Sequence, residues 1–89
     1  MRISRQVQSI AERVECALKL AEETGRTPIA IALGKDDYPA FKEWAREALG
    51  QEFEPGAKFL GVPVRHLENV FLSRVELKSK PGVPNALLL

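Results

Sequence analysis

The 89-residue sequence has one cysteine, one histidine, one methionine and no long hydrophobic run. A single cysteine, Cys16, excludes an internal disulfide, so nothing points to an oxidising compartment. The longest apolar runs, residues 29–33 and 86–89, are far shorter than the roughly 20 residues of a membrane-spanning helix. The first residues also lack the apolar segment of a secretory signal. We therefore expect a cytoplasmic protein without a membrane partner.

An excess of charge of either sign is also missing. Thirteen basic residues face 12 acidic ones, which gives a net charge of +1 and no strong bulk attraction to nucleic acid. Apolar residues make up 45% and charged residues 28%, as in an ordinary globular protein. We expect one α+β domain over residues 1–77 and a flexible C-terminal tail over residues 78–89, whose prolines, glycine and asparagine favour loops.

Two amphipathic helices are predicted from hydrophobic periodicity. Apolar residues recur at spacings of three and four over residues 3–24, where Ser4 is a suitable N-cap and Gly25 a suitable end. A second helix extends to about residue 49, with Asp36 or Asp37 as its cap and Gly50 as its stop.

Three strands are predicted, over residues 29–33, 59–64 and 70–77. The last two are separated by residues 65–69, a length typical of a hairpin connection. The element order α-β-α-β-β predicts a two-layer fold, with two helices packed on one face of a three-stranded mixed sheet. The other face of the first strand then needs cover, which a partner or a second copy of the chain would supply.

Chemistry-bearing residues are few. His66 is the only histidine, and Asp36 and Asp37 follow a strand at a helix start, so a small enzyme that relies on His66 is one hypothesis. A solvated histidine and a helix cap explain the same residues without catalysis. We assign no catalytic residue, no metal ligand and no cofactor, no small-molecule substrate is evident, and we expect a protein that is not an enzyme.

Exposed apolar positions favour protein binding instead. Cys16 and Leu20 lie away from the apolar stripe of the first helix, and Trp44 lies at the margin of the second. The sequence ends in three leucines on a polar segment. These leucines can dock on a neighbouring subunit, fold back on the bare face of the sheet, mark the chain for proteolysis, or remain unstructured. The candidate interface residues are Cys16, Leu20, Trp44, Leu87, Leu88 and Leu89.

A nucleic-acid-binding accessory protein is the alternative hypothesis. Residues 59–89 hold four basic and two acidic residues, and a basic hairpin and tail can contact phosphate. The candidate contacts are Arg65, Arg74, Lys78 and Lys80. This segment lacks the aromatic platform of RNA-binding sheets, so protein binding or self-assembly is the preferred prediction.

Two segments carry a resemblance. Residues 31–41, which read IALGKDDYPAF, and residues 59–64, which read FLGVPV, resemble parts of small uncharacterised proteins encoded by bacteriophages and prophages. The order of elements also resembles a fragment of the peripheral domain of capsid proteins with the HK97-type fold. The resemblance implies a phage or prophage origin and a role in particle assembly, and it transfers no catalytic residue.

Overall fold

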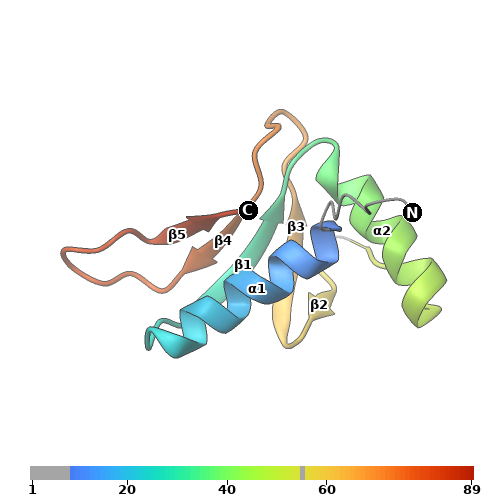
Figure 1. The fold of residues 1–89 in the computed structure, drawn as a ribbon. Coiled ribbons are helices and arrows are strands. Elements are labelled where there is room, and N and C mark those ends of the chain that lie inside the picture. The colour runs from blue at the N-terminus through green and yellow to red at the C-terminus, as the bar shows by residue number, and fades with distance from the viewer. Residues whose placement is uncertain (1–8, 55) are drawn as a thin grey trace, which may run out of the picture.

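The computed structural model describes residues 9–54 and 56–89, which form an α+β fold with two helices and a mixed sheet (Figure 1). The helices are α1 (Ile10–Glu23) and α2 (Asp37–Leu49). The strands are β1 (Pro28–Leu33), β2 (Lys58–Phe59), β3 (Val62–His66), β4 (Arg74–Leu77) and β5 (Ala86–Leu88). The sheet order is β2-β3-β1-β4-β5, and both helices share one hydrophobic core with a single face of this sheet.

Helix α1 begins at Ile10, later than the periodicity predicted. Ser9 has an extended backbone and caps the helix, accepting from the Glu12 N–H while the Glu12 carboxylate accepts from the Ser9 N–H. This reciprocal pair satisfies two N–H groups that a helix start otherwise leaves open. The predicted cap Ser4 lies outside the described residues. The predicted end is confirmed, because Gly25 follows the helix with a positive φ of 72°.

Helix α2 starts and ends where predicted, but it lacks the predicted side-chain cap. Gly50 is its C-cap in the left-handed conformation, where a glycine lacks the Cβ that would clash. Asp36 is at the N-cap position but makes no side-chain capping bond. Asp37 is instead used in contacts with two other elements, which are described below.

The predicted three-stranded sheet with a β3–β4 hairpin is wrong, because the sheet has five strands and β1 lies between β3 and β4. Strand β1 pairs with β3 in parallel and with β4 in antiparallel orientation. β1 is the most apolar strand, and the central position buries both of its faces. Residues 67–73 therefore cross over the end of β1 instead of turning back tightly.

The segment expected to be a flexible tail contains β5, the edge strand next to β4. Leu87 and Leu89 pack against the hydrophobic core, and the Leu89 N–H donates to the Ser73 carbonyl at 3.0 Å. Leu88 points to the other face and is 72% exposed. The leucines do not fold back on the bare sheet face, as one expectation had it: β5 extends the sheet at its edge, and Leu87 and Leu89 pack on the face that the helices cover.

The helix-free face of the sheet is covered by the chain's own charged side chains. Ala30 and Ala32 are buried although they lie outside the hydrophobic core. The Arg65 guanidinium on β3 reaches the Glu76 carboxylate on β4 at 2.9 Å, and this ion pair passes directly over β1. Arg74 binds the same carboxylate at 2.9 Å. The small alanines thus leave room for long side chains to lie flat, and this part of the face needs no partner as cover.

Candidate functional site

The loop between β3 and β4 exposes three consecutive large hydrophobic residues. Val70, Phe71 and Leu72 are 39%, 68% and 64% exposed, and they follow one another without a polar residue between them. Figure 1 shows this connection projecting past the end of the sheet. We call residues 70–72 the apolar loop. Contiguous exposed hydrophobic residues of this kind are typical of interaction sites.

Backbone contacts hold the apolar loop against the end of β1. The Lys35 N–H donates to the Val70 carbonyl at 2.7 Å. A Cβ added to Gly34 would lie 2.5 Å from the Phe71 carbonyl oxygen, so only glycine allows this approach. The Lys35 ammonium lies over the Phe71 ring, 5.4 Å from its centroid, where the ring attracts the cation.

A buried polar network anchors the C-terminal side of the loop. The Ser73 hydroxyl accepts from the Gly34 N–H at 2.8 Å and donates to the Asp37 carboxylate. The other Asp37 oxygen accepts from the Arg13 guanidinium at 3.2 Å. Ser73 is only 2% exposed, whereas the Arg13 and Asp37 side chains are 35% and 23% exposed, so the network joins α1, α2 and two loops around a buried hydroxyl. The apolar loop is thus presented from a preorganised base.

The His66 ring stacks on Tyr38 beside this network, with centroids 4.3 Å apart and planes 9° from parallel. Burial raises the pKa of the Tyr38 hydroxyl above its usual 10.0, and the Glu54 charge raises it further. Neither Asp36 nor Asp37 bonds to His66 among the described residues; Asp37 is occupied by Ser73 and Arg13. The groups named in the enzyme hypothesis are therefore not assembled into a hydrogen-bonded catalytic pair in this part of the chain.

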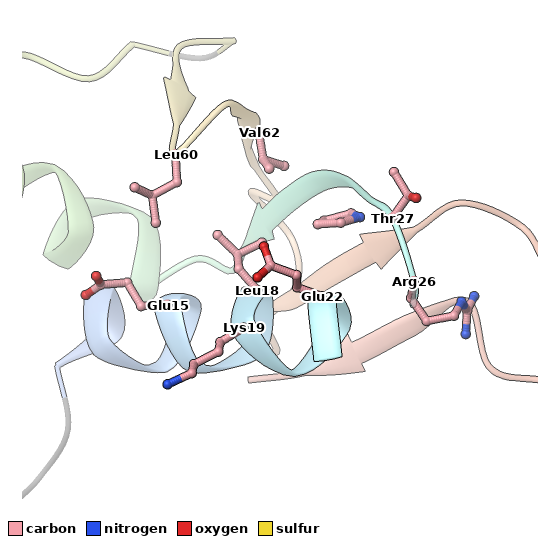
Figure 2. A pocket seen from close by; sticks show the side chains of 9 residues that line it. Glu15, Leu18, Lys19, Glu22, Arg26, Thr27, Leu60 and Val62 are labelled. Atoms are coloured by element: carbon pink, nitrogen blue, oxygen red, sulfur yellow. The ribbon is translucent and has the colours of Figure 1, made fainter. Parts of the chain in front are cut away.

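A groove of about 620 Å³ lies at the opposite end of β1, between α1 and the β2–β3 turn. Leu18, Leu60, Val62 and Pro28 supply its apolar surface, and charged residues of α1 form its rim. Figure 2 shows Leu60 and Leu18 facing one another from the two walls, with Lys19 and Arg26 pointing away. The volume is within the range of natural binding clefts.

Leu60 has an unusual conformation for its residue type. Its φ is 53°, and with Gly61 at 82° it forms the two-residue connection between β2 and β3. Two positive φ values are typical of a type I′ turn, in which asparagine and glycine are the preferred residues. A leucine there is strained and, at 63%, largely exposed. Its side chain forms one wall of the groove.

The predicted interface residues are not brought together. Cys16 and Leu20 are exposed on α1. Trp44 packs on α2 against the core, edge-on to Phe59 with centroids 5.8 Å apart. Of the three C-terminal leucines, Leu87 and Leu89 belong to the core and only Leu88 is exposed.

The four candidate nucleic-acid contacts divide into two pairs. Arg65 and Arg74 meet at Glu76 on the helix-free face, where the carboxylate offsets part of their charge. Lys78 and Lys80 line a small hollow of about 120 Å³ with Arg26 and neighbouring residues of the α1–β1 turn. Arg26 is itself engaged there, donating to the carbonyls of Pro84 and Lys78.

Neither described helix is long and apolar enough to cross a membrane. Within residues 9–54 and 56–89, no group of three or more histidine, cysteine or carboxylate side chains is placed to hold a metal ion. Comparisons with protein-family models, curated proteins and solved structures find no match for this chain. The phage or prophage origin implied by the resemblance stays a prediction.

The apolar loop and Leu60 were missed by the sequence analysis. Residues 70–72 were assigned to a strand that places Phe71 on the same buried face as Ser73 and Val75. The strand instead begins at Arg74, and Phe71 is exposed. No local signal marks this boundary, because the crossing over β1 is a long-range feature. The glycine after Leu60 was the one available hint of a turn.

Proposed function

We propose that this chain is a non-catalytic protein-binding protein that attaches to other polypeptides, its own copies included, through the apolar loop. The observation that carries the proposal is the exposure of three consecutive large hydrophobic side chains on a braced loop. Leaving such a surface in water is unfavourable, and binding would remove it from water.

The bracing of the loop supports a binding role. A flexible loop loses conformational entropy when a partner orders it, whereas a preorganised loop avoids most of that cost. Here the Lys35 and Gly34 backbones and the Ser73 hydroxyl already hold both ends of the loop. Phe71 lies at the centre of this loop, and aromatic residues, phenylalanine included, are enriched at the cores of protein interfaces.

The two alternatives have less support. The nucleic-acid hypothesis depends on Arg65, Arg74, Lys78 and Lys80. Both arginines already pair with Glu76, and the two lysines lie in a separate hollow beside Arg26. The enzyme hypothesis depends on His66, which stacks on Tyr38. No observation on the basic residues or on His66 favours the corresponding hypothesis over protein binding.

Site-specific photo-crosslinking tests the proposal. A photoreactive phenylalanine analogue is placed at position 71, and the matched control carries it at Gln51, an exposed residue after α2. Both chains are irradiated alone and in an extract of the source cells. We expect a discrete cross-linked product from position 71 only. An excess of unlabelled wild-type chain should abolish it, and the same excess of a Phe71→Ser chain should not.

Absence of any product at position 71, in both the purified chain and the extract, would overturn the proposal. Equal products at positions 71 and 51 would do the same, because they would indicate contact without a preferred surface. The circular dichroism spectrum of each labelled chain shows that its fold is retained.

A further inference from the structure

Resting on the proposed protein binding, we infer that one partner of the apolar loop is a second copy of this chain, which receives it in the groove between α1 and the β2–β3 turn. The two features lie at opposite ends of β1. The groove is lined by Pro28, the first residue of the strand, and the loop contacts Gly34, the residue just after its end. At about 3.3 Å per residue, they are roughly 20 Å apart along the strand.

The two surfaces are both apolar, and one projects where the other is hollow. The loop is an apolar projection centred on Phe71, and the groove presents Leu18, Leu60 and Val62 as its apolar walls. The volume of about 620 Å³ is sufficient for an aromatic side chain and its neighbour. A surface that projects at one end of the chain therefore has an apolar receptor at the other.

The charges around the two surfaces are complementary. Lys35 accompanies Phe71, with its ammonium 5.4 Å from the ring centroid. On the groove rim, Figure 2 shows Glu22 beside Leu18. Arg26 also lines the groove, but its guanidinium is bound to the carbonyls of Pro84 and Lys78. A docked loop would bring the Lys35 ammonium to the Glu22 carboxylate, while Lys19 and Arg26, which also line the groove, point away from it (Figure 2). This pairing of opposite charges favours one orientation of the loop over the reversed one.

The conformation of Leu60 is the second observation that points to the groove. An asparagine at this position would relieve the backbone strain, yet the chain has a leucine that is strained and exposed. Strain at a well-defined position is often associated with function. In the single chain the Leu60 side chain is largely exposed, whereas contact with an incoming Phe71 would bury it.

Contact between different surfaces on identical chains is heterologous, so each copy keeps one free loop and one free groove. The assembly therefore grows head to tail, into an open array or a closed ring. One loop in one groove is a small interface, well below the about 1,200 Å² of a stable complex, so we expect association to rise gradually with concentration.

Light scattering on the full chain and two variants tests the inference. Phe71→Ser removes the projection, and Leu60→Asn removes one groove wall while giving the turn its preferred residue. We expect the molar mass of the wild type to rise above 9.9 kDa between about 1 μM and 1 mM. Each variant alone should remain at the mass of one chain. Leu60→Asn should also melt at the same or a higher temperature, which separates loss of assembly from loss of fold.

Mixing the two variants gives the sharper result. The Leu60→Asn chain keeps its loop and the Phe71→Ser chain keeps its groove, so the mixture should reach the mass of two chains and stop there. A mixture that stays monomeric would overturn the loop-in-groove contact even if the wild type associates. Undiminished association of Leu60→Asn alone would overturn it as well.

Charge reversal tests the register. Lys35→Glu and Glu22→Lys should each weaken association by about tenfold, and the double variant should recover most of the loss. Arg46→Glu, a charge reversal at an exposed position of α2 that belongs to neither surface, is the control. Failure of the double variant to recover would overturn the Lys35–Glu22 register.

A wild-type chain that stays monomeric throughout would overturn the second copy as partner. It would leave the proposed protein binding in place if position 71 still forms its specific cross-link in the extract. Loss of both results would overturn both proposals.

Discussion

At the scale of single residues, Ser73 is a buried polar residue just before β4, and it connects that strand to the rest of the fold. Its hydroxyl accepts from the Gly34 N–H and donates to Asp37, so both its hydrogen-bonding roles are used. A buried hydrogen bond of this kind adds only modestly to the free energy of unfolding. Removing one partner costs more, because the other is then left buried without a hydrogen bond.

Ser73→Ala is expected to destabilise the chain by about 1–3 kcal/mol, because the Gly34 N–H loses its acceptor in a buried position. Urea unfolding followed by circular dichroism measures the loss. Ser79→Ala, at an exposed position, is the matched control and should change the free energy of unfolding by less than about 0.5 kcal/mol. An equal effect of the two substitutions would contradict the role assigned to Ser73.

Tyr38 predicts a pH effect at alkaline pH. Its folded-state pKa is raised above 10.0, first by burial and then by Glu54, so the neutral hydroxyl is favoured in the folded chain. The resulting stability is fully present below the unfolded pKa and is lost as the pH rises through the folded pKa. The free energy of unfolding should therefore fall above about pH 10.

Tyr38→Phe should remove that part of the pH dependence while keeping the ring that stacks on His66. The comparison is the difference in unfolding free energy between the two chains at pH values on either side of 10.0. All other titratable groups are common to both chains, so the difference isolates the contribution of the Tyr38 hydroxyl. A constant difference across the range would show that Tyr38 contributes no such effect.

At the scale of elements, residues 78–89 show how a segment with two prolines can contain a strand. Only its apolar end, Ala86–Leu88, forms β5. Its pairing with β4 places alternate residues on opposite faces, with Leu87 opposite Val75 and Leu88 opposite Arg74. The core can thus use Leu87 and Leu89, although neither lies in an element with strong local preference.

The alternation in β5 gives a direct test with two neighbouring leucines. Leu87→Ala should lower the free energy of unfolding by about 1 kcal/mol or more, because its half-buried side chain packs on the core. Leu88→Ala, at a residue 72% exposed, should change it by less than about 0.5 kcal/mol. Thermal melts of both chains measure the contrast. A larger loss from Leu88→Ala would mean that β5 pairs in the other register.

At the scale of the whole molecule, the net charge and the positions of the charged residues determine how strongly the chain can attract nucleic acid. The chain carries +1 overall, and Glu76 offsets part of the positive charge of Arg65 and Arg74. Binding to a polyanion gains mainly from releasing counterions, which requires several unneutralised cations along one surface.

We therefore expect no shift of a labelled DNA or RNA probe at about 50 mM salt, the condition that favours electrostatic binding. Fluorescence anisotropy with a titration of the chain measures this. Glu76→Gln, which frees both arginines, is the comparison variant and should bind more strongly than the wild type if the basic face has any affinity. A salt-dependent shift by the wild-type chain would favour the nucleic-acid hypothesis over protein binding.

The sequence by itself determined the elements whose signals are local. Hydrophobic periodicity predicted both helices, Gly25 and Gly50 marked their ends, and the alternating run of residues 29–33 predicted a buried strand. The mixed sheet also followed from the element order, and the parallel direction of β1 and β3 agrees with the right-handed strand–helix–strand connection, although the neighbour of β1 did not follow from the sequence. These features depend on residues close together in the chain, so the sequence contains enough information to predict them.

Only the tertiary structure decided the strand order, the fifth strand and the candidate site. The insertion of β1 between β3 and β4 depends on which strand gains most from burial on both faces, which is a comparison across the whole chain. The exposure of Phe71 follows from that order, because residues 67–73 must cross the end of β1. The pairing of Arg65 with Glu76 over β1 likewise joins residues that no local pattern connects.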